Sequence, residues 1–430
     1  MMTVLNNINT YRLQYKNQFI LYANYLLVLY AFFLPINDSI TRNLFTIILI
    51  LFILVGDIKN KIIFAMKNKV VQAFVLFYLM YFFWMFGSES FDVAMFKLKS
   101  YRYILYIILY ITIIREDFSY KILSAFILGV LFSEIISYLM LFGITVPYLP
   151  YSLAGGNVPF MISYTQYSIV LSISLGVILY GIVTSTQNSL TKILYILFFI
   201  SASANIFIIQ SKLGYGLYAI SIMTISILLI MKYKRYWVIP LFLVLIIGGY
   251  AVAYNTSSTF HNKVNVVFNS TKQAIDNENY STSVGVRVGF HKYGYELILQ
   301  NPLFGLGTGD HISDYMLYIK DKESNESNYL TMQRNLESGG GGSLHSEYLD
   351  ITLQFGLVGL LIFLNIFYQL LKYKTQDYYM KTVQVLFITI LLTDAAIGGI
   401  FSVSKIGKIF TLLSALTLRL YYNKNGDKTD

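Results

Sequence analysis

Cysteine is absent from this chain of 430 residues, which excludes disulfide bonds, thiolate metal sites and a cysteine nucleophile. Charged residues are scarce, at 13% of the chain against about 25% in a soluble globular protein. The sequence also lacks a Walker phosphate loop, a Gly-x-Ser-x-Gly nucleophile motif and a His-Glu-x-x-His zinc motif. These absences disfavour P-loop nucleotide enzymes, serine hydrolases of that type and zinc proteases.

Apolar residues dominate instead, at 56% of the chain with a mean hydropathy of +0.59. Apolar runs long enough to cross a bilayer recur along the whole sequence, so the chain is expected to be an integral membrane protein. The net charge of +10 falls mostly at the ends of these runs, where the positive-inside rule accounts for it. We therefore expect membrane lipids as partners and no nucleic acid.

Twelve apolar runs are predicted to span the membrane. They cover residues 18–36, 41–56, 70–87, 103–114, 119–142, 159–183, 190–210, 213–231, 236–254, 346–371, 380–402 and 405–422. The first run lacks a small-residue cleavage site and is expected to remain as a helix. The prediction is an all-α polytopic membrane protein with helices 1–9 in residues 1–254, a long loop in 255–344, and helices 10–12 with a tail in 345–430.

Basic residues set the expected orientation. Lysine and arginine follow spans two, four, eight and ten, begin span seven and occur in the C-terminal tail, so they fall on one side of the membrane. By the positive-inside rule that side is cytoplasmic and holds both termini. The long loop between spans nine and ten then faces outward.

Seven basic residues depart from this rule and are expected at outer helix ends. They are Arg42, Lys97, Lys99, Arg102, Lys212, Lys405 and Lys408. Any one of them is accounted for by a snorkelling side chain or by a nearby acid. Together, on the side of the long loop, they predict a cationic cavity for an anionic ligand such as a lipid-linked diphosphate. Lys212 lies between two apolar runs with almost no loop. It is interpreted either as a ligand-binding residue or as a solvated lysine in a simple hairpin turn.

The long loop contains one segment with a helical pattern, residues 286–300, in which Arg287 and His291 lie four apart on one face. Asn301-Pro302 is expected to end this helix, and Gly305, Gly307 and Gly309 are interpreted as a turn rather than a nucleotide motif. The polar residues 311–337 are expected to be exposed or mobile. The Gly/Ser run 338–343 has the composition of a flexible linker, native or engineered.

His345 follows this run and begins span ten. A neutral imidazole there could act as a base toward a hydroxyl, although an isolated histidine more commonly caps a helix or lies at an interface. Glu347 and Asp350 are the nearby acids. One histidine with one carboxylate provides too few ligands for a typical metal site, and no Asp-x-Asp pair is expected on the outer side. We therefore expect no metal and no cofactor.

Three segments in order resemble the O-antigen ligase/polymerase family, whose signature is its Wzy_C region. They are Ser283-Val284-Gly285-Val286-Arg287, the turn Asn301-Pro302-Leu303-Phe304-Gly305-Leu306-Gly307-Thr308-Gly309, and His345-Ser346-Glu347-Tyr348-Leu349 followed by Gln354-Phe355-Gly356-Leu357-Val358-Gly359-Leu360. The layout of twelve spans with one long outer loop is similar as well. The specific motifs cover about residues 283–360.

The resemblance implies a metal-independent, inverting membrane glycosyltransferase of the GT-C type in the bacterial inner membrane, with its active side periplasmic. Such an enzyme transfers a glycan from undecaprenyl diphosphate to an acceptor hydroxyl during cell-envelope lipopolysaccharide biosynthesis. Carried over by motif, Arg287 would contact the diphosphate and His345 would contact or deprotonate the acceptor. Lys212 stands where the family more often has an arginine after serine, and Ser346 where it has asparagine. Lys99 and Arg102 are assigned to the diphosphate as further cations.

The acceptor is not readable from the sequence. The His-x-x-Tyr-Leu run favours an O-antigen ligase, whose acceptor is the lipid A-core, over a Wzy-type polymerase, whose acceptor is another lipid-linked repeat unit with a chain-length regulator as a further partner. A transporter of anionic lipid-linked sugars is the third interpretation. The absence of an internal repeat between the two halves disfavours transport.

Overall fold

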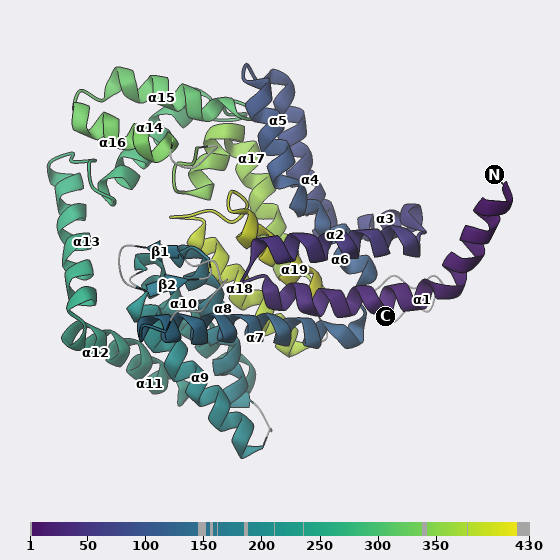
Figure 1. The fold of residues 1–430 in the computed structure, drawn as a ribbon. Coiled ribbons are helices and arrows are strands. Elements are labelled where there is room, and N and C mark those ends of the chain that lie inside the picture. The colour runs from purple at the N-terminus through teal and green to yellow at the C-terminus, as the bar shows by residue number, and fades with distance from the viewer. Residues whose placement is uncertain are drawn as a thin grey trace.

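The structure is a computed structural model of residues 1–430. It describes residues 2–144, 152–154, 158–160, 162–184, 188–209, 211–234, 236–337, 342–375 and 377–418. Figure 1 shows long helices packed side by side, with the shorter helices α14, α15 and α16 gathered at one end beside α17 and α5. A polytopic helical membrane protein is therefore the architecture.

The elements before the long loop begin with a helical pair and continue through short 3₁₀ segments into the longer helices. They are α1 (Met2–Phe33), α2 (Asp38–Val55), α3 (Ile58–Met66), α4 (Lys69–Trp84), η1 (Met85–Gly87), α5 (Phe91–Ser100), η2 (Tyr101–Leu105), α6 (Tyr106–Ile113), α7 (Glu116–Leu141), α8 (Tyr164–Thr184), α9 (Ser189–Ile208), α10 (Lys212–Tyr233), α11 (Val238–Leu243), the π-helical stretch η3 (Val244–Gly248) and α12 (Gly249–Thr256). Two short antiparallel strands, β1 (Ser152–Ala154) and β2 (Val158–Phe160), add the one departure from helix among the described elements.

The rest of the chain is also helical. It consists of α13 (Ser258–Asp276), α14 (Gly285–Gln300), α15 (Asp310–Lys322), α16 (Glu326–Glu337), α17 (Glu347–Lys372), α18 (Tyr378–Asp394) and α19 (Ser404–Leu418). The predicted helix 286–300 is confirmed as α14. Residues 311–337 were expected to be exposed or mobile, but they form α15 and α16, because their few apolar residues share one face. The Gly/Ser run lies outside the described residues from 338 to 341.

Eight segments in the described ranges are long and apolar enough to cross a membrane. They are Asp38–Val55, Lys69–Gly87, Glu116–Leu141, Tyr164–Thr184, Ser189–Ile208, Lys212–Tyr233, Ile239–Thr256 and Glu347–Lys372. Each corresponds to one of the twelve predicted spans. The other four, 18–36, 103–114, 380–402 and 405–422, are not confirmed.

The prediction of one continuous span over 380–402 is wrong. Helix α18 ends at Asp394, and the amides of Ile397 and Gly398 turn back onto the Asp394 carbonyl at 3.0 and 2.7 Å. Such i→i+3 and i→i+4 bonds to one carbonyl are common in the last turn of a helix, and glycine is common just after it. The segment between α18 and α19 therefore folds back toward the start of α17.

Two large apolar clusters hold the described helices together, beside a small one around Ile36 and Ile136. The larger of the two joins the long helices. The second large cluster is built from α14, α15 and α16 and includes Leu349 and Leu353 of α17. The helices of the long loop are therefore packed onto the first turns of α17 and fix their position.

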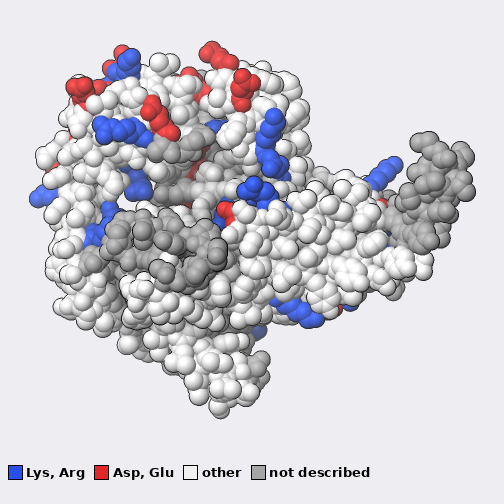
Figure 2. Space-filling view, in the orientation of Figure 1, with Lys and Arg blue, Asp and Glu red and all other residues white. Residues whose placement is uncertain are grey.

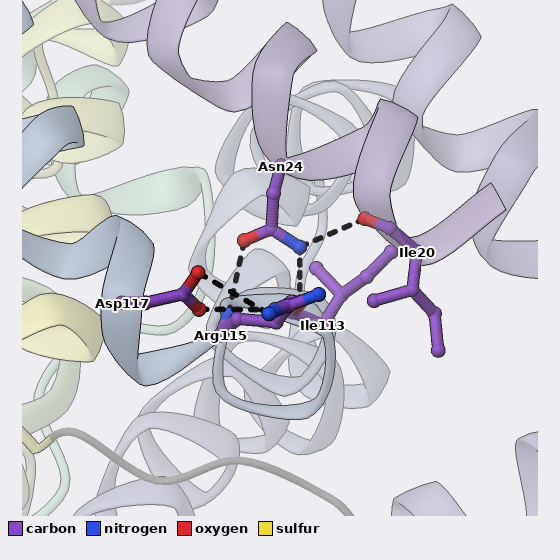
Figure 3. A network of polar contacts seen from close by, with 5 residues as sticks. All are labelled: Ile20, Asn24, Ile113, Arg115 and Asp117. Carbon is purple, nitrogen blue, oxygen red and sulfur yellow. Dashed lines mark hydrogen bonds and ion pairs between the residues drawn. The ribbon is translucent and has the colours of Figure 1, made fainter. Parts of the chain in front are cut away.

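Asn24 fastens α1 to the break between α6 and α7 (Figure 3). It is fully buried, and its amide donates to the carbonyls of Ile20 and Ile113, both at 2.8 Å. Its oxygen accepts from the Arg115 amide at 2.9 Å, and the Arg115 guanidinium pairs with Asp117. A single buried side chain thus satisfies backbone groups that the end of α6 and the start of α7 leave without helical partners.

Two glycine motifs dock onto each other by backbone contact. Gly305, at φ +65°, lies against the backbone of residues 354–356, and Gly356, also at φ +65°, kinks α17 against Leu303. A Cβ on Gly356 would lie 2.3 Å from the Leu303 carbonyl, so no other residue fits without backbone movement. The Leu306 and Gly307 amides donate to carbonyls of α17 at 3.0 and 2.9 Å. The predicted turn is confirmed, and these two amides are used within the protein.

Candidate functional site

Three predicted site residues lie at the starts of three helices. Lys212 is the first residue of α10, Arg287 is the third residue of α14, and His345 precedes α17 by two residues. Ser211 and Ser346 cap α10 and α17 by accepting from Gly214 and Leu349 amides. Because helix N-termini carry partial positive charge, this arrangement favours an anion.

Lys212 and Arg287 meet at Ser283. The Lys212 ammonium donates to the Ser283 hydroxyl at 3.1 Å, and the Arg287 guanidinium donates to the Ser283 carbonyl at 3.0 Å. The charges of Arg287 and Lys263 both act on Lys212. No carboxylate among the described residues forms an ion pair with Lys212 or Arg287. The pair is therefore an uncompensated positive centre, which attracts an anionic ligand.

Arg287 is partly buried with its cation intact. Burial lowers the pKa of Arg287, and the Tyr164 side chain at the start of α8 opposes this effect. The guanidinium still remains charged, because arginine is not deprotonated in proteins. Its Nε is buried without a hydrogen-bond partner among the described groups. A donor is thus left over for a group that enters the site.

His345 is held in an uncommon backbone conformation. Its φ is +56°, a left-handed geometry that is unfavourable for residues other than glycine. Its amide donates to the Ser343 hydroxyl at 3.2 Å, and its ring lies nearly parallel to Phe290 of α14, with ring centres 6.0 Å apart. Burial lowers the pKa of His345, and the charge of Arg287 lowers it further. The imidazole is therefore neutral at neutral pH and can accept a proton.

Asp350 fixes the segment that carries His345. Its two carboxylate oxygens accept from the Leu344 amide at 2.9 Å and from the Ser343 hydroxyl at 2.7 Å. Ser343 in turn accepts from the His345 amide. Asp350 thus acts on His345 through the backbone, without touching its ring.

Glu347 connects the same region to the turn after α18. Its carboxylate accepts from the Ser402 hydroxyl at 2.8 Å, and its amide donates to the carbonyls of Ala395 and Gly398 at 2.9 Å. The segment that breaks the predicted span 380–402 is therefore the segment that supports the start of α17.

A buried lysine–histidine pair lies close enough to the start of α17 for its carboxylates to act on the lysine. The Lys97 ammonium is 3.1 Å from His311 Nε2, and the carboxylates of Asp350 and Glu347 act on Lys97. Burial lowers the pKa of Lys97 to about 8, and burial followed by the charge of Lys97 lowers the pKa of His311 well below its usual value. His311 is therefore neutral and accepts from the lysine.

Lys99 and Arg102 are exposed and belong to different surroundings. Arg102 donates to the Lys99 carbonyl at 3.1 Å, and its charge acts on Lys408 of α19. No described contact joins either residue to Lys212 or Arg287, so their assignment to the diphosphate stays a prediction. Figure 2 shows Lys and Arg side chains on both sides of a hollowed area in this face of the molecule.

Sequence reasoning named Asp350 as a nearby acid but gave it no role, and it missed Ser343 and His311. Asp350 could have been given a role from its position in the first turn of the helix that follows the histidine. His311 could not, because its partner Lys97 is 214 positions away in the chain.

Residues 196–364 match the family model described as O-antigen ligase. This segment of the chain is similar to the O-antigen ligase family. The match includes Lys212, Arg287 and His345, together with both glycine motifs. No curated protein matches the chain significantly. The part of the chain that the structure describes contains no group of three His, Asp or Glu side chains placed to hold a metal ion. Metal independence itself stays a prediction.

Proposed function

We propose that this O-antigen ligase family protein is a membrane glycosyltransferase that moves a glycan from undecaprenyl diphosphate to a hydroxyl of the lipid A-core. The observation that carries the proposal is that Lys212 and Arg287 meet at Ser283 without an ion-pair partner among the described residues, and that the charge of Arg287 acts on the neutral imidazole of His345. Cations suit a diphosphate leaving group, and a neutral histidine suits a hydroxyl nucleophile.

The cations act on the donor. The diphosphate gains negative charge as its bond to the sugar breaks, and fixed positive groups stabilise that charge in the transition state. Arg287 contributes the Nε–H that has no partner among the described groups, and Lys212 contributes an ammonium held by Ser283. A lysine provides a point charge rather than the two-pronged contact of an arginine.

His345 acts on the acceptor. Its imidazole takes the proton from the attacking hydroxyl as the acceptor oxygen forms a bond to the anomeric carbon. The bond from that carbon to the diphosphate oxygen breaks, and undecaprenyl diphosphate leaves with the electron pair. Attack opposite the leaving group inverts the anomeric configuration. The chemistry requires no nucleotide and no metal.

The proposal places the site on the periplasmic side of the bacterial inner membrane, with both termini cytoplasmic and a GT-C-type helix arrangement around it. The positive-inside distribution of the basic residues supports this orientation. If the acceptor is instead a second lipid-linked repeat unit, the same donor chemistry makes a polymerase, for which a chain-length regulator is the expected partner.

The deciding experiment compares surface glycans and lipid-linked intermediates in a strain without this gene. Long glycan on undecaprenyl diphosphate, with bare core lipid, identifies a ligase. A single repeat unit on the core, without a ladder, identifies a polymerase. An unchanged ladder contradicts both.

Site variants test the assignment in a reconstituted transfer assay. Arg287→Ala and His345→Ala should each lower transfer at least 100-fold. The matched controls are Arg334→Ala, on the exposed part of α16, and His291→Ala, whose ring bonds to its own helix at the Arg287 carbonyl. If both site variants keep wild-type transfer, the site assignment is wrong.

A further inference from the structure

A second group of cations lies on three other elements. Lys405 and Lys408 of α19 flank Asp38, at 3.3 and 3.9 Å from its carboxylate oxygens. The charges of Arg42 on α2 and Arg102 in η2 both act on Lys408. Four cations thus gather around one acid, and we call them the α2–α19 cluster.

Ring stacking packs α2 against the start of α6. Phe45 and Tyr106 stack with ring centres 3.8 Å apart and 21° between their planes. Phe45 lies one helical turn after Arg42 on α2, and Tyr106 directly follows the η2 segment that carries Arg102. The stack therefore holds together the two elements that carry the arginines.

A second contact ties η2 to α19. The Tyr103 hydroxyl donates to the Phe401 carbonyl, four residues before Lys405. The Tyr103 ring also lies against Gly407, so close that a Cβ there would meet it. Lys405 and Lys408 are one turn apart on α19. Arg102 and the lysine pair are therefore held by neighbouring packed groups, which makes the cluster a built feature rather than a chance approach of long side chains.

The charges of the cluster do not balance. Lys405 is nearly buried, with 6% of its side chain exposed, and is paired with Asp38. Neither Arg42 nor Arg102 forms an ion pair with an acid in the described ranges. Like charges held together near the membrane are unfavourable unless an anion joins them. A bound phosphate group would offset part of this excess of positive charge.

We propose that the α2–α19 cluster binds the phosphate group of the lipid-anchored acceptor. The assignment rests on the proposed function. In an inverting transfer the leaving diphosphate and the attacking oxygen lie on opposite sides of the anomeric carbon. Two lipid-anchored, anionic substrates then need two separate cationic sites. Lys212 and Arg287 form one, on α10 and α14, and the cluster forms the other, with no described contact between the two. This proposal assigns Arg102 to the acceptor phosphate in place of the donor diphosphate, because its charge acts on Lys408.

The test uses the full-length protein in nanodiscs of phosphatidylcholine, so that the two substrates are the only anionic lipids. Arg42→Gln/Arg102→Gln removes two exposed charges of the cluster and leaves the buried Lys405–Asp38 pair intact. The matched control is Lys59→Gln/Lys67→Gln, which removes two exposed lysines beyond the other end of α2. Transfer rates are measured with each substrate varied in turn.

The cluster variant should raise KM for the acceptor about tenfold, with KM for the donor and kcat within about twofold of wild type and the control unchanged. An unchanged acceptor KM, or an equal rise in donor KM, overturns the proposal. Loss of phosphatidylglycerol binding without any change in acceptor KM also overturns it, because the cluster then serves ordinary phospholipid headgroups.

A separate readout does not depend on catalysis. Native mass spectrometry compares retention of the phosphorylated acceptor with that of its dephosphorylated form. Wild type should retain the phosphorylated form preferentially, and the cluster variant should lose that preference. If wild type binds with this preference but transfers nothing, the proposed function fails while the phosphate site stands.

Discussion

Asp350 offers the sharpest test of how the site is held together. Its carboxylate accepts from the Leu344 amide and the Ser343 hydroxyl, and through them it supports the left-handed backbone of His345. In Asp350→Asn the amide side chain can accept only through Oδ1, so one of the two charge-assisted contacts is lost. Such a contact contributes about 1.5–3 kcal/mol. The left-handed conformation itself costs about 1–3 kcal/mol.

If the conformation of His345 that is competent for transfer is destabilised by about 1.4 kcal/mol, the rate falls tenfold. Asp350→Asn should therefore lower kcat about tenfold. KM for the donor should stay near wild type, because Lys212 and Arg287 do not contact Asp350. The acid limb of the pH profile should stay in place, since burial and Arg287, not Asp350, lower the pKa of His345. Steady-state transfer at several pH values measures all three.

Asp310→Asn is the matched control. Asp310 accepts from the Ser88 hydroxyl and from the amides of Glu89 and Ser90, all at 2.9 Å, so its substitution removes the same kind of contact. It joins α15 to the start of α5 rather than supporting His345. An equal fall of kcat in the two variants would mean that Asp350 contributes only to general stability, and an unchanged kcat in Asp350→Asn would refute the positioning argument.

Three further outcomes are expected. The acid limb of kcat/KM should lie below pH ~6.5, because burial and then Arg287 lower the pKa of His345, and a limb above that value contradicts the geometry. Gly356→Ala should lower stability by about 1–3 kcal/mol in thermal unfolding, because of its positive φ, whereas Gly216→Ala, with open space around it, should not. The free energy of unfolding of the wild type should fall as the pH drops below ~6.5, by up to about 1.4 kcal/mol per pH unit, because His311 binds a proton in the unfolded state but not in the folded state. The His311→Gln variant should lose less stability over the same pH range, measured by the same unfolding experiment.

The membrane helices were predictable wherever the length and hydropathy of one apolar run are enough to determine a span. An apolar run of about 20 residues has one stable arrangement in a bilayer, and eight predicted spans meet that standard in the structure. The run 380–402 failed because apolar composition does not reveal that Asp394 ends a helix. The turn after Asp394 is bound by Glu347 from elsewhere in the chain, whose amide donates to the Ala395 and Gly398 carbonyls and whose carboxylate accepts from Ser402.

The glycine motifs show a different limit. A turn at Gly305 could be predicted from the residues beside it. Gly356 was singled out only because its segment resembles a family motif, and its contact with the turn was not predicted. The two meet through backbone atoms about fifty residues apart, and neither side chain nor periodicity records that contact. The left-handed conformation of His345 was hidden for the same reason, since it depends on Ser343 and Asp350 rather than on the histidine.

The sequence predicts seven basic residues at outer helix ends, but it could not predict which of them are neighbours in the fold. Membrane topology determines which side of the bilayer a helix start occupies, but not which helix starts are neighbours. Packing separates the predicted single cavity: Lys212 joins Arg287, Lys97 turns inward to His311, and Arg102 joins Lys408. A transfer between two anionic lipids requires this separation, because one shared positive centre would bind both phosphates on the same side of the reacting carbon. The division of the cations is thus the feature that links the packing of the helices to the chemistry proposed for them.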